Sequence, residues 1–110
     1  MTESEFNDRI DETLELIEET LDDAETDIDV QLGGGILTII CENKTQIIFT
    51  RQAPVLQLWV ATRSGGFHFN FDTGTSSWVR DSDSMPLDQF MTTTYAEQAG
   101  ESLTFSLTGA

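Results

Sequence analysis

The chain has 110 residues, of which 20 are acidic and 5 are Lys or Arg, so its formal net charge is −15. This length, with 38 % hydrophobic residues, favours one folded domain spanning residues 1–110. The negative charge makes nucleic acid and anionic membranes poor partners, and favours cations and basic protein surfaces. Thirteen of the acidic residues lie among the first thirty, where Arg9 is the only base.

The N-terminus lacks the basic and apolar segments of a signal peptide, and no stretch of the sequence is typical of a membrane span. The single cysteine, Cys41, cannot form an internal disulfide, so we expect a reducing, cytoplasmic location. Cys41 ends an apolar run that begins at Ile36, which predicts a small buried side chain and not a reactive one.

Residues 3–23 have the apolar spacing of an amphipathic helix. The opposite side of this helix is crowded with acidic residues, several of them near its C-terminus, which is the unfavourable end for negative charge. Few of them have a basic partner four residues away. Local propensity and charge therefore do not explain the arrangement, which suggests a function. The apolar positions are Phe6, Ile10, Leu14, Ile17 and Leu21.

The middle of the chain changes to a period of two, which is typical of strands. Closely spaced turns, including Gly33–Gly35, indicate an antiparallel meander. A second helix is predicted from about Ser84 to Gly100, followed by an extended tail with alternating apolar residues. We therefore expect an α+β fold: a two-layer α/β sandwich in which two terminal helices pack on one face of an antiparallel sheet of about six strands. The predicted strands are 27–32, 36–42, 45–51, 55–62, 67–71 and 77–80.

The acidic side of the first helix, continued into the next loop and strand, is a candidate cation site. Carboxylates are hard oxygen ligands that suit iron, calcium, magnesium or lanthanides, and the absence of Cys or His among them excludes a structural zinc site. A calcium-binding EF-hand is also excluded, because Ile28 and Gly34 stand where that loop requires Gly and Glu. We expect an open surface that binds several cations weakly; the alternative is an ordinary solvated face. The candidate ligands are Glu15, Glu18, Glu19, Asp22, Asp23, Glu25, Asp27 and Asp29. Asp27 and Asp29, two apart on the predicted strand, are expected to point the same way.

A second candidate surface is the face of the sheet away from the helices. If Leu56, Leu58 and Val60 face the helices, Gln57 and Trp59 face outward, and an outward tryptophan is a frequent interface anchor. The alternative is that a loop or the tail covers Trp59. By the same alternation, the residues expected beside it are Thr50, Gln52, His68 and Asn70. His68 has no evident partner for metal binding in the sequence. No nucleophile–base pair or phosphate-binding loop is recognisable, so we expect no enzyme activity and no catalytic residues.

These features together resemble the frataxin family in its bacterial form, the CyaY type, over nearly the whole chain. The likeness lies in the order and spacing of several motifs. They are Ser4-Glu5-Phe6, Ile17-Glu18-Glu19, Leu21-Asp22-Asp23, Asp27-Ile28-Asp29, Gly34-Gly35-Ile36-Leu37-Thr38-Ile39, Arg51-Gln52-Ala53-Pro54, Gln57-Leu58-Trp59-Val60-Ala61-Thr62 and Gly65-Gly66-Phe67-His68-Phe69. The sequence departs from the family at Thr50, where Asn is common, and at Asn70, where Asp is common; the loop after Asp23 is also short.

The resemblance implies a helix–sheet–helix sandwich that assists or regulates iron–sulfur cluster assembly, as an iron chaperone and not as an enzyme. Iron, ferrous or ferric, is expected to bind weakly and at several places, where other di- and trivalent cations can substitute. The implied partners are the cysteine desulfurase and the iron–sulfur scaffold protein, and the implied state is a monomer that metal can convert into oligomers. The carried-over contact residues are Glu18, Glu19, Asp22 and Asp23 on the acidic surface, with Gln57 and Trp59 on the sheet.

Three other functions compete with this hypothesis. A general acidic cation buffer and an inhibitor that mimics DNA would both use the same clustered carboxylates. A ferroxidase would need an enclosed site, which the sequence does not suggest.

Overall fold

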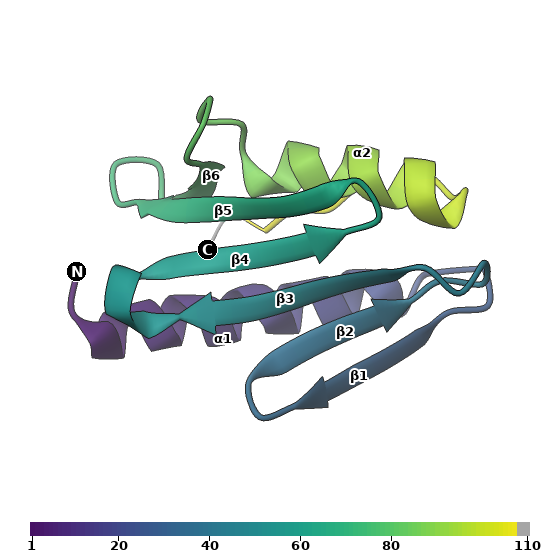
Figure 1. Ribbon diagram of the computed structural model, residues 1–110, viewed down its shortest axis with the longest axis horizontal. Helices are drawn as coiled ribbons and strands as arrows, with labels where there is room; N and C mark the ends of the chain where they lie inside the picture. Colours follow the sequence, from purple (N-terminus) through teal and green to yellow (C-terminus); the bar gives the residue numbers. More distant parts are fainter. Residues whose placement is uncertain (108–110) are drawn as a thin grey trace.

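The computed structural model describes residues 1–107, in which two helices cover one face of a six-stranded antiparallel sheet (Figure 1). The strands follow one another in the order β1 to β6, which is the predicted meander. Residues 108–110 of the predicted domain lie outside the described part of the chain. The elements are α1 (Glu3–Leu21), β1 (Asp29–Gly33), β2 (Ile36–Ile40), β3 (Gln46–Gln52), the 3₁₀ helix η1 (Ala53–Val55), β4 (Gln57–Thr62), β5 (Gly65–Asp72), β6 (Ser77–Arg80) and α2 (Leu87–Ala99).

Helix α1 forms where the apolar spacing predicts it, and its N-terminus is fixed by a capping box. The Thr2 hydroxyl accepts a hydrogen bond from the Glu5 amide, and the Glu5 carboxylate accepts one from the Thr2 amide, each at 3.1 Å. The helix ends at Leu21, two residues before the predicted boundary, as Asp23 bonds the carbonyl only three residues back. The five predicted apolar positions of the stripe are all buried against the sheet.

The sheet register separates a buried face from an outer face. Leu37 and Ile39 of β2 are fully buried beneath the helices, whereas Thr38 between them pairs with Gln31 and Ile48 on the outer face. The β1–β2 turn places Gly34 and Gly35 at φ values of +61° and +76°, a conformation that glycine adopts without steric cost. The predicted antiparallel two-layer fold is therefore confirmed.

Several strand boundaries differ from the prediction by one or two residues, among them the starts of β4 and β1. Strand β4 begins at Gln57 because Pro54 lies in η1 and Leu56 adopts a left-handed conformation with φ +52°. Strand β1 begins at Asp29, so Asp27 lies in the preceding loop and not on the strand.

The second helix and the tail complete the core. Helix α2 begins at Leu87, with Pro86 at its N-cap, three residues after the predicted start at Ser84. Gly100, with φ +73°, ends it as the sequence predicts. After α2 the chain runs back along the helix, where the Phe105 amide bonds Thr92 Oγ1 and the Leu107 amide bonds the Asp88 carboxylate. Phe105 and Leu107 are buried, so the expected docking of the tail is confirmed.

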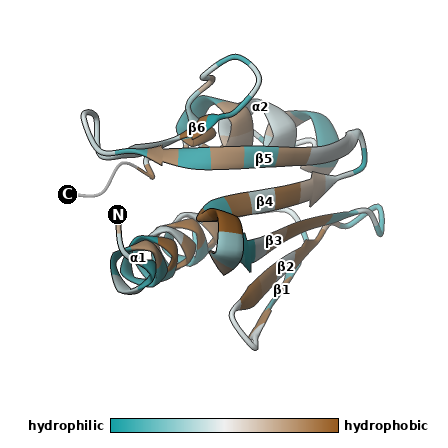
Figure 2. Ribbon diagram, turned by 60° about the vertical axis from the view of Figure 1, so that its left-hand side comes forward, coloured by the Kyte–Doolittle hydropathy of each residue, from teal (hydrophilic) through white to brown (hydrophobic). Residues whose placement is uncertain are grey.

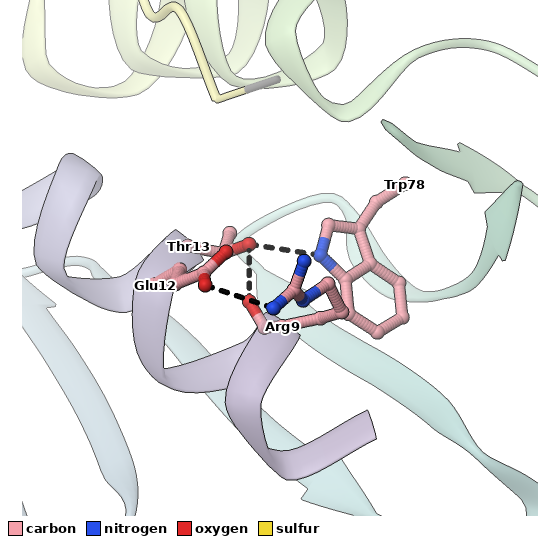
Figure 3. A network of polar contacts seen from close by, with 4 residues as sticks. All are labelled: Arg9, Glu12, Thr13 and Trp78. Carbon is pink, nitrogen blue, oxygen red and sulfur yellow. Dashed lines mark hydrogen bonds and ion pairs between the residues drawn. The ribbon is translucent and has the colours of Figure 1, made fainter. Parts of the chain in front are cut away.

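A buried polar contact connects α1 to β6. Trp78, which is 1 % exposed, donates its indole N–H to Thr13 Oγ1 at 2.9 Å, and Thr13 in turn donates to the Arg9 carbonyl at 2.8 Å (Figure 3). The Arg9 side chain turns to Glu12 on the same helix, 2.9 Å away. Trp78 is therefore a packing residue, and it fixes α1 against the far end of the sheet.

Candidate functional site

The eight carboxylates predicted as metal ligands follow one border of the molecule, from the second half of α1 through the next loop to the first residue of β1. Seven of the eight are exposed, and Glu18 is half-buried. We call this set the acidic ridge. It consists of Glu15, Glu18, Glu19, Asp22, Asp23, Glu25, Asp27 and Asp29.

Within residues 1–107, no basic side chain forms an ion pair with the acidic ridge. The last turn of α1 contains no basic residue, and none of the four ion pairs among residues 1–107 involves a ridge carboxylate. Two bases that contact α1 are already paired with acids outside the ridge: Arg9 of α1 with Glu12, and Arg51 of β3 with Asp11. The ridge therefore presents uncompensated negative charge to solvent, and multivalent cations and basic surfaces reduce its self-repulsion.

The ridge is an open surface with ligands that face different ways. Within residues 1–107, no three His, Cys, Asp or Glu side chains are arranged as a group that could hold a metal ion. Asp29 pairs in register with Ile40 and accepts a hydrogen bond from Gln31 on the outer face, whereas Asp27 lines a hollow next to α1. The expectation that Asp27 and Asp29 point the same way is wrong, because only Asp29 lies on the strand.

The loop of the ridge is anchored by a residue that the sequence did not single out. Glu101, just beyond α2, accepts hydrogen bonds from the Glu25 amide at 2.7 Å and from Thr26 Oγ1 at 2.8 Å. Tyr95 donates to the same carboxylate at 3.2 Å. These bonds, first of all the one from the Glu25 amide, hold the pKa of Glu101 below its usual value of 4.5. Glu101 therefore positions the loop that carries Glu25 and Asp27.

The outer face of the sheet carries the second predicted set of residues. Trp59 pairs in register with Thr50 on β3 and His68 on β5, and Gln57 pairs with Asn70. Trp59 is half-buried, and its ring stacks on the His68 ring with centroids 4.3 Å apart and planes inclined by 16°. The predicted placement of Trp59 on the outer face is confirmed.

Hydrogen bonds hold this face in one arrangement. The Trp59 indole N–H donates to Gln57 Oε1 at 2.9 Å, and the Gln57 amide donates to Asn70 Oδ1 at 3.1 Å. On the other side of the stack, His68 Nδ1 lies 3.6 Å from Asp81 Oδ2. Asp81 is a partner for His68 that sequence spacing could not reveal. This face therefore presents the stacked rings of Trp59 and His68, with hydrogen bonds that tie Trp59 to Gln57 and Gln57 to Asn70.

The single cysteine of the chain, Cys41, lies in the interior. Cys41 is 2 % exposed, and its burial raises the pKa of the thiol, which disfavours the reactive thiolate. Cys41 is therefore a small buried side chain, as predicted.

Comparison with known proteins shows the family of the chain. The frataxin-like domain family matches residues 1–101. The chain belongs to the frataxin family. Two curated relatives named iron–sulfur cluster assembly protein CyaY cover 96 % of the chain. The protein of Pseudomonas aeruginosa is 41 % identical over 105 residues, which is 97 % of its length. That of Pseudomonas syringae pv. syringae is 43 % identical over 106 residues, or 96 % of its length.

Two solved structures share the fold. Frataxin from Psychromonas ingrahamii superimposes with a TM-score of 0.87 at 31 % identity, covering 96 % of this chain and 99 % of that one. Trimeric yeast frataxin complexed with ferrous iron superimposes with a TM-score of 0.69 at 25 % identity, covering 88 % and 87 %. Neither helix among residues 1–107 is long and apolar enough to cross a membrane.

Proposed function

We propose that this chain binds iron weakly on the acidic ridge and assists iron–sulfur cluster assembly by docking on the cysteine desulfurase and its scaffold protein, in the bacterial cytoplasm. The observation that carries the proposal is the ridge: eight carboxylates on one border, seven of them exposed and none in an ion pair within residues 1–107. The names of the relatives and the ferrous complex of the yeast protein support the same function.

In this role iron is cargo and not a resident cofactor. An open carboxylate surface leaves most of a cation's water in place and offers little preorganisation, so affinity should be micromolar or weaker. Titration with ferrous iron or a lanthanide should shift or broaden the amide signals of the ridge residues in several steps. A single tight site centred on His68 would contradict the proposal.

The ridge also accounts for partner binding by charge. A basic desulfurase surface would be attracted over the whole ridge, so neutralising or reversing charges should slow association and flatten the salt dependence. The test is Asp22→Lys with Asp23→Lys, measured by the association rate with purified desulfurase. The matched control is Glu42→Lys with Glu97→Lys, because both are exposed acids outside the ridge and the change in net charge is the same.

Equal losses in the two double variants would mean that only net charge matters and that the ridge is not a docking site. Capture of a nucleic-acid enzyme in place of the desulfurase would indicate the DNA-mimic alternative. Cation binding with no protein partner would indicate a general buffer.

The outer face of the sheet is the proposed contact with the scaffold. Trp59 is held by its stack on His68 and its bond to Gln57, so little conformational freedom is lost when a partner covers it. Trp59→Ala should weaken the complex that contains the scaffold by about 2 kcal/mol or more if the residue is a hot spot. Its salt dependence should not change. Unchanged scaffold-dependent binding would contradict the role of this face.

A further inference from the structure

A groove separates α1 from the edge strand β1 on the helix-bearing side of the sheet. Two hollows of about 600 Å³ and 360 Å³ lie along it and share Glu18 as a lining residue. The groove exists because the β1–β2 hairpin diverges from α1 (Figure 2). Strand β1 is at the edge of the sheet, with β2 as its only neighbouring strand among residues 1–107.

The floor of the groove is apolar and incompletely covered. Leu32 pairs in register with Leu37, whose side chain is fully buried, so Leu32 also points to the helix side. Leu32 nevertheless remains 52 % exposed, one of the few large apolar side chains exposed to this extent. Leu14 of α1 lines the same hollow, and Val30 lines the adjoining one.

The walls of the groove are negative. Its lining includes five carboxylates and a single base, Arg51, which is already bound to Asp11 at 2.7 Å. Anionic ligands and a second copy of this chain are therefore unfavourable occupants. An apolar floor between carboxylate walls suits a long cationic side chain, which has an aliphatic stem and a charged head.

We propose that the groove between α1 and β1 receives a Lys- or Arg-bearing segment of a partner protein. The methylene stems lie over Leu14 and Leu32, and the cationic heads bind Glu15 and Glu18. This inference rests on the proposed docking of the desulfurase. It adds an apolar contact at a defined place to an attraction that is otherwise only electrostatic.

The apolar contact has a distinct signature. Raising the salt concentration weakens the attraction between exposed charges, whereas burial of apolar surface is not screened. Leu32→Ser should therefore reduce affinity for purified desulfurase about fivefold to tenfold, as expected for covering half a leucine side chain. The slope of affinity against salt should stay that of the wild type.

The matched control is Ile36→Ser on the same hairpin. Ile36 is 43 % exposed, but it alternates with the buried Leu37 and so lies on the opposite face of the sheet. In the absence of scaffold protein it should leave desulfurase binding unchanged. Circular dichroism and thermal melts verify that both variants are folded.

A second arm does not depend on the desulfurase. A synthetic peptide of alternating arginine and leucine should shift the methyl signals of Leu14 and Leu32, and should do so less in a Glu15→Gln, Glu18→Gln variant. If the wild-type protein binds this peptide but not the desulfurase, the proposed function is wrong, whereas the inference that the groove binds cationic segments stands. Three results would overturn the inference. Leu32→Ser could bind the desulfurase with wild-type affinity, Leu32→Ser and Ile36→Ser could lose the same affinity, or the peptide could leave the methyl signals of Leu14 and Leu32 unchanged.

Discussion

The buried hydrogen bond between Trp78 and Thr13 is expected to contribute measurably to the free energy of unfolding, because it connects α1 to the sheet. Thr13→Val keeps the shape of the side chain but leaves the Trp78 indole N–H, in a residue only 1 % exposed, without its acceptor. An unsatisfied buried donor costs about 1–3 kcal/mol. For a domain of this size that corresponds to a fall in melting temperature of about 4–12 °C. Thermal and urea unfolding both measure the loss.

A matched control separates this bond from the general effect of a valine in a helix. Thr20 donates to the Leu16 carbonyl just as Thr13 donates to the Arg9 carbonyl, but no tryptophan within residues 1–107 donates to Thr20. Thr20→Val should therefore cost much less than Thr13→Val. In a Trp78→Phe background, which has no indole N–H, Thr13→Val should lose most of its effect. Additive effects of the two substitutions would refute the reasoning.

The remaining predictions concern the loop, the hairpin and the ridge. Glu101→Gln should lower the free energy of unfolding at neutral pH, as measured by urea melts. Because the pKa of Glu101 is lowered in the folded state, the carboxylate contributes stability above its unfolded-state pKa and loses that contribution as it is protonated. The difference between variant and wild type should therefore shrink below about pH 4.5. Gly35→Ala should lower the melting temperature, because φ is +76° at this position and a Cβ would lie 3.1 Å from Arg51 Nε. The control is Gly66→Ala, which should change the melting temperature little because a Cβ there would have no neighbouring atom within 4 Å. Added salt or multivalent cations should raise the melting temperature of the metal-free protein, as they screen the ridge or bind to it; an insensitive midpoint would contradict strain in the ridge.

The elements that the sequence predicted well are those with a strong local signal. The period of the apolar residues located α1, and the alternation along the fourth strand placed Trp59 on the outer face. The boundaries near Asp27 and Val55 were wrong, because the ends of strands depend on turn geometry and not on periodicity.

The contacts that position the candidate site were not predictable in the same way. Glu101 binds the Glu25 amide 76 residues away, and Thr13 meets Trp78 across 65 residues. Neither pair leaves a spacing signal, because each forms only after the sheet has brought two distant segments together. The groove beside Leu32 likewise depends on how far the hairpin diverges from α1, and no pattern of residue types encodes that distance.

The structure also explains how α1 tolerates so much negative charge. Among residues 1–107, no base forms an ion pair with the acids in its second half, and its last turn has no base to interact with the helix dipole. The opposite side buries Phe6, Ile10 and Ile17 completely, and burying one such side chain contributes about 1.5–3 kcal/mol. Repulsion between exposed charges in water is much smaller per pair. Packing against the sheet therefore holds the ridge in place, so its carboxylates are free to bind cations or a basic partner without being needed for the fold.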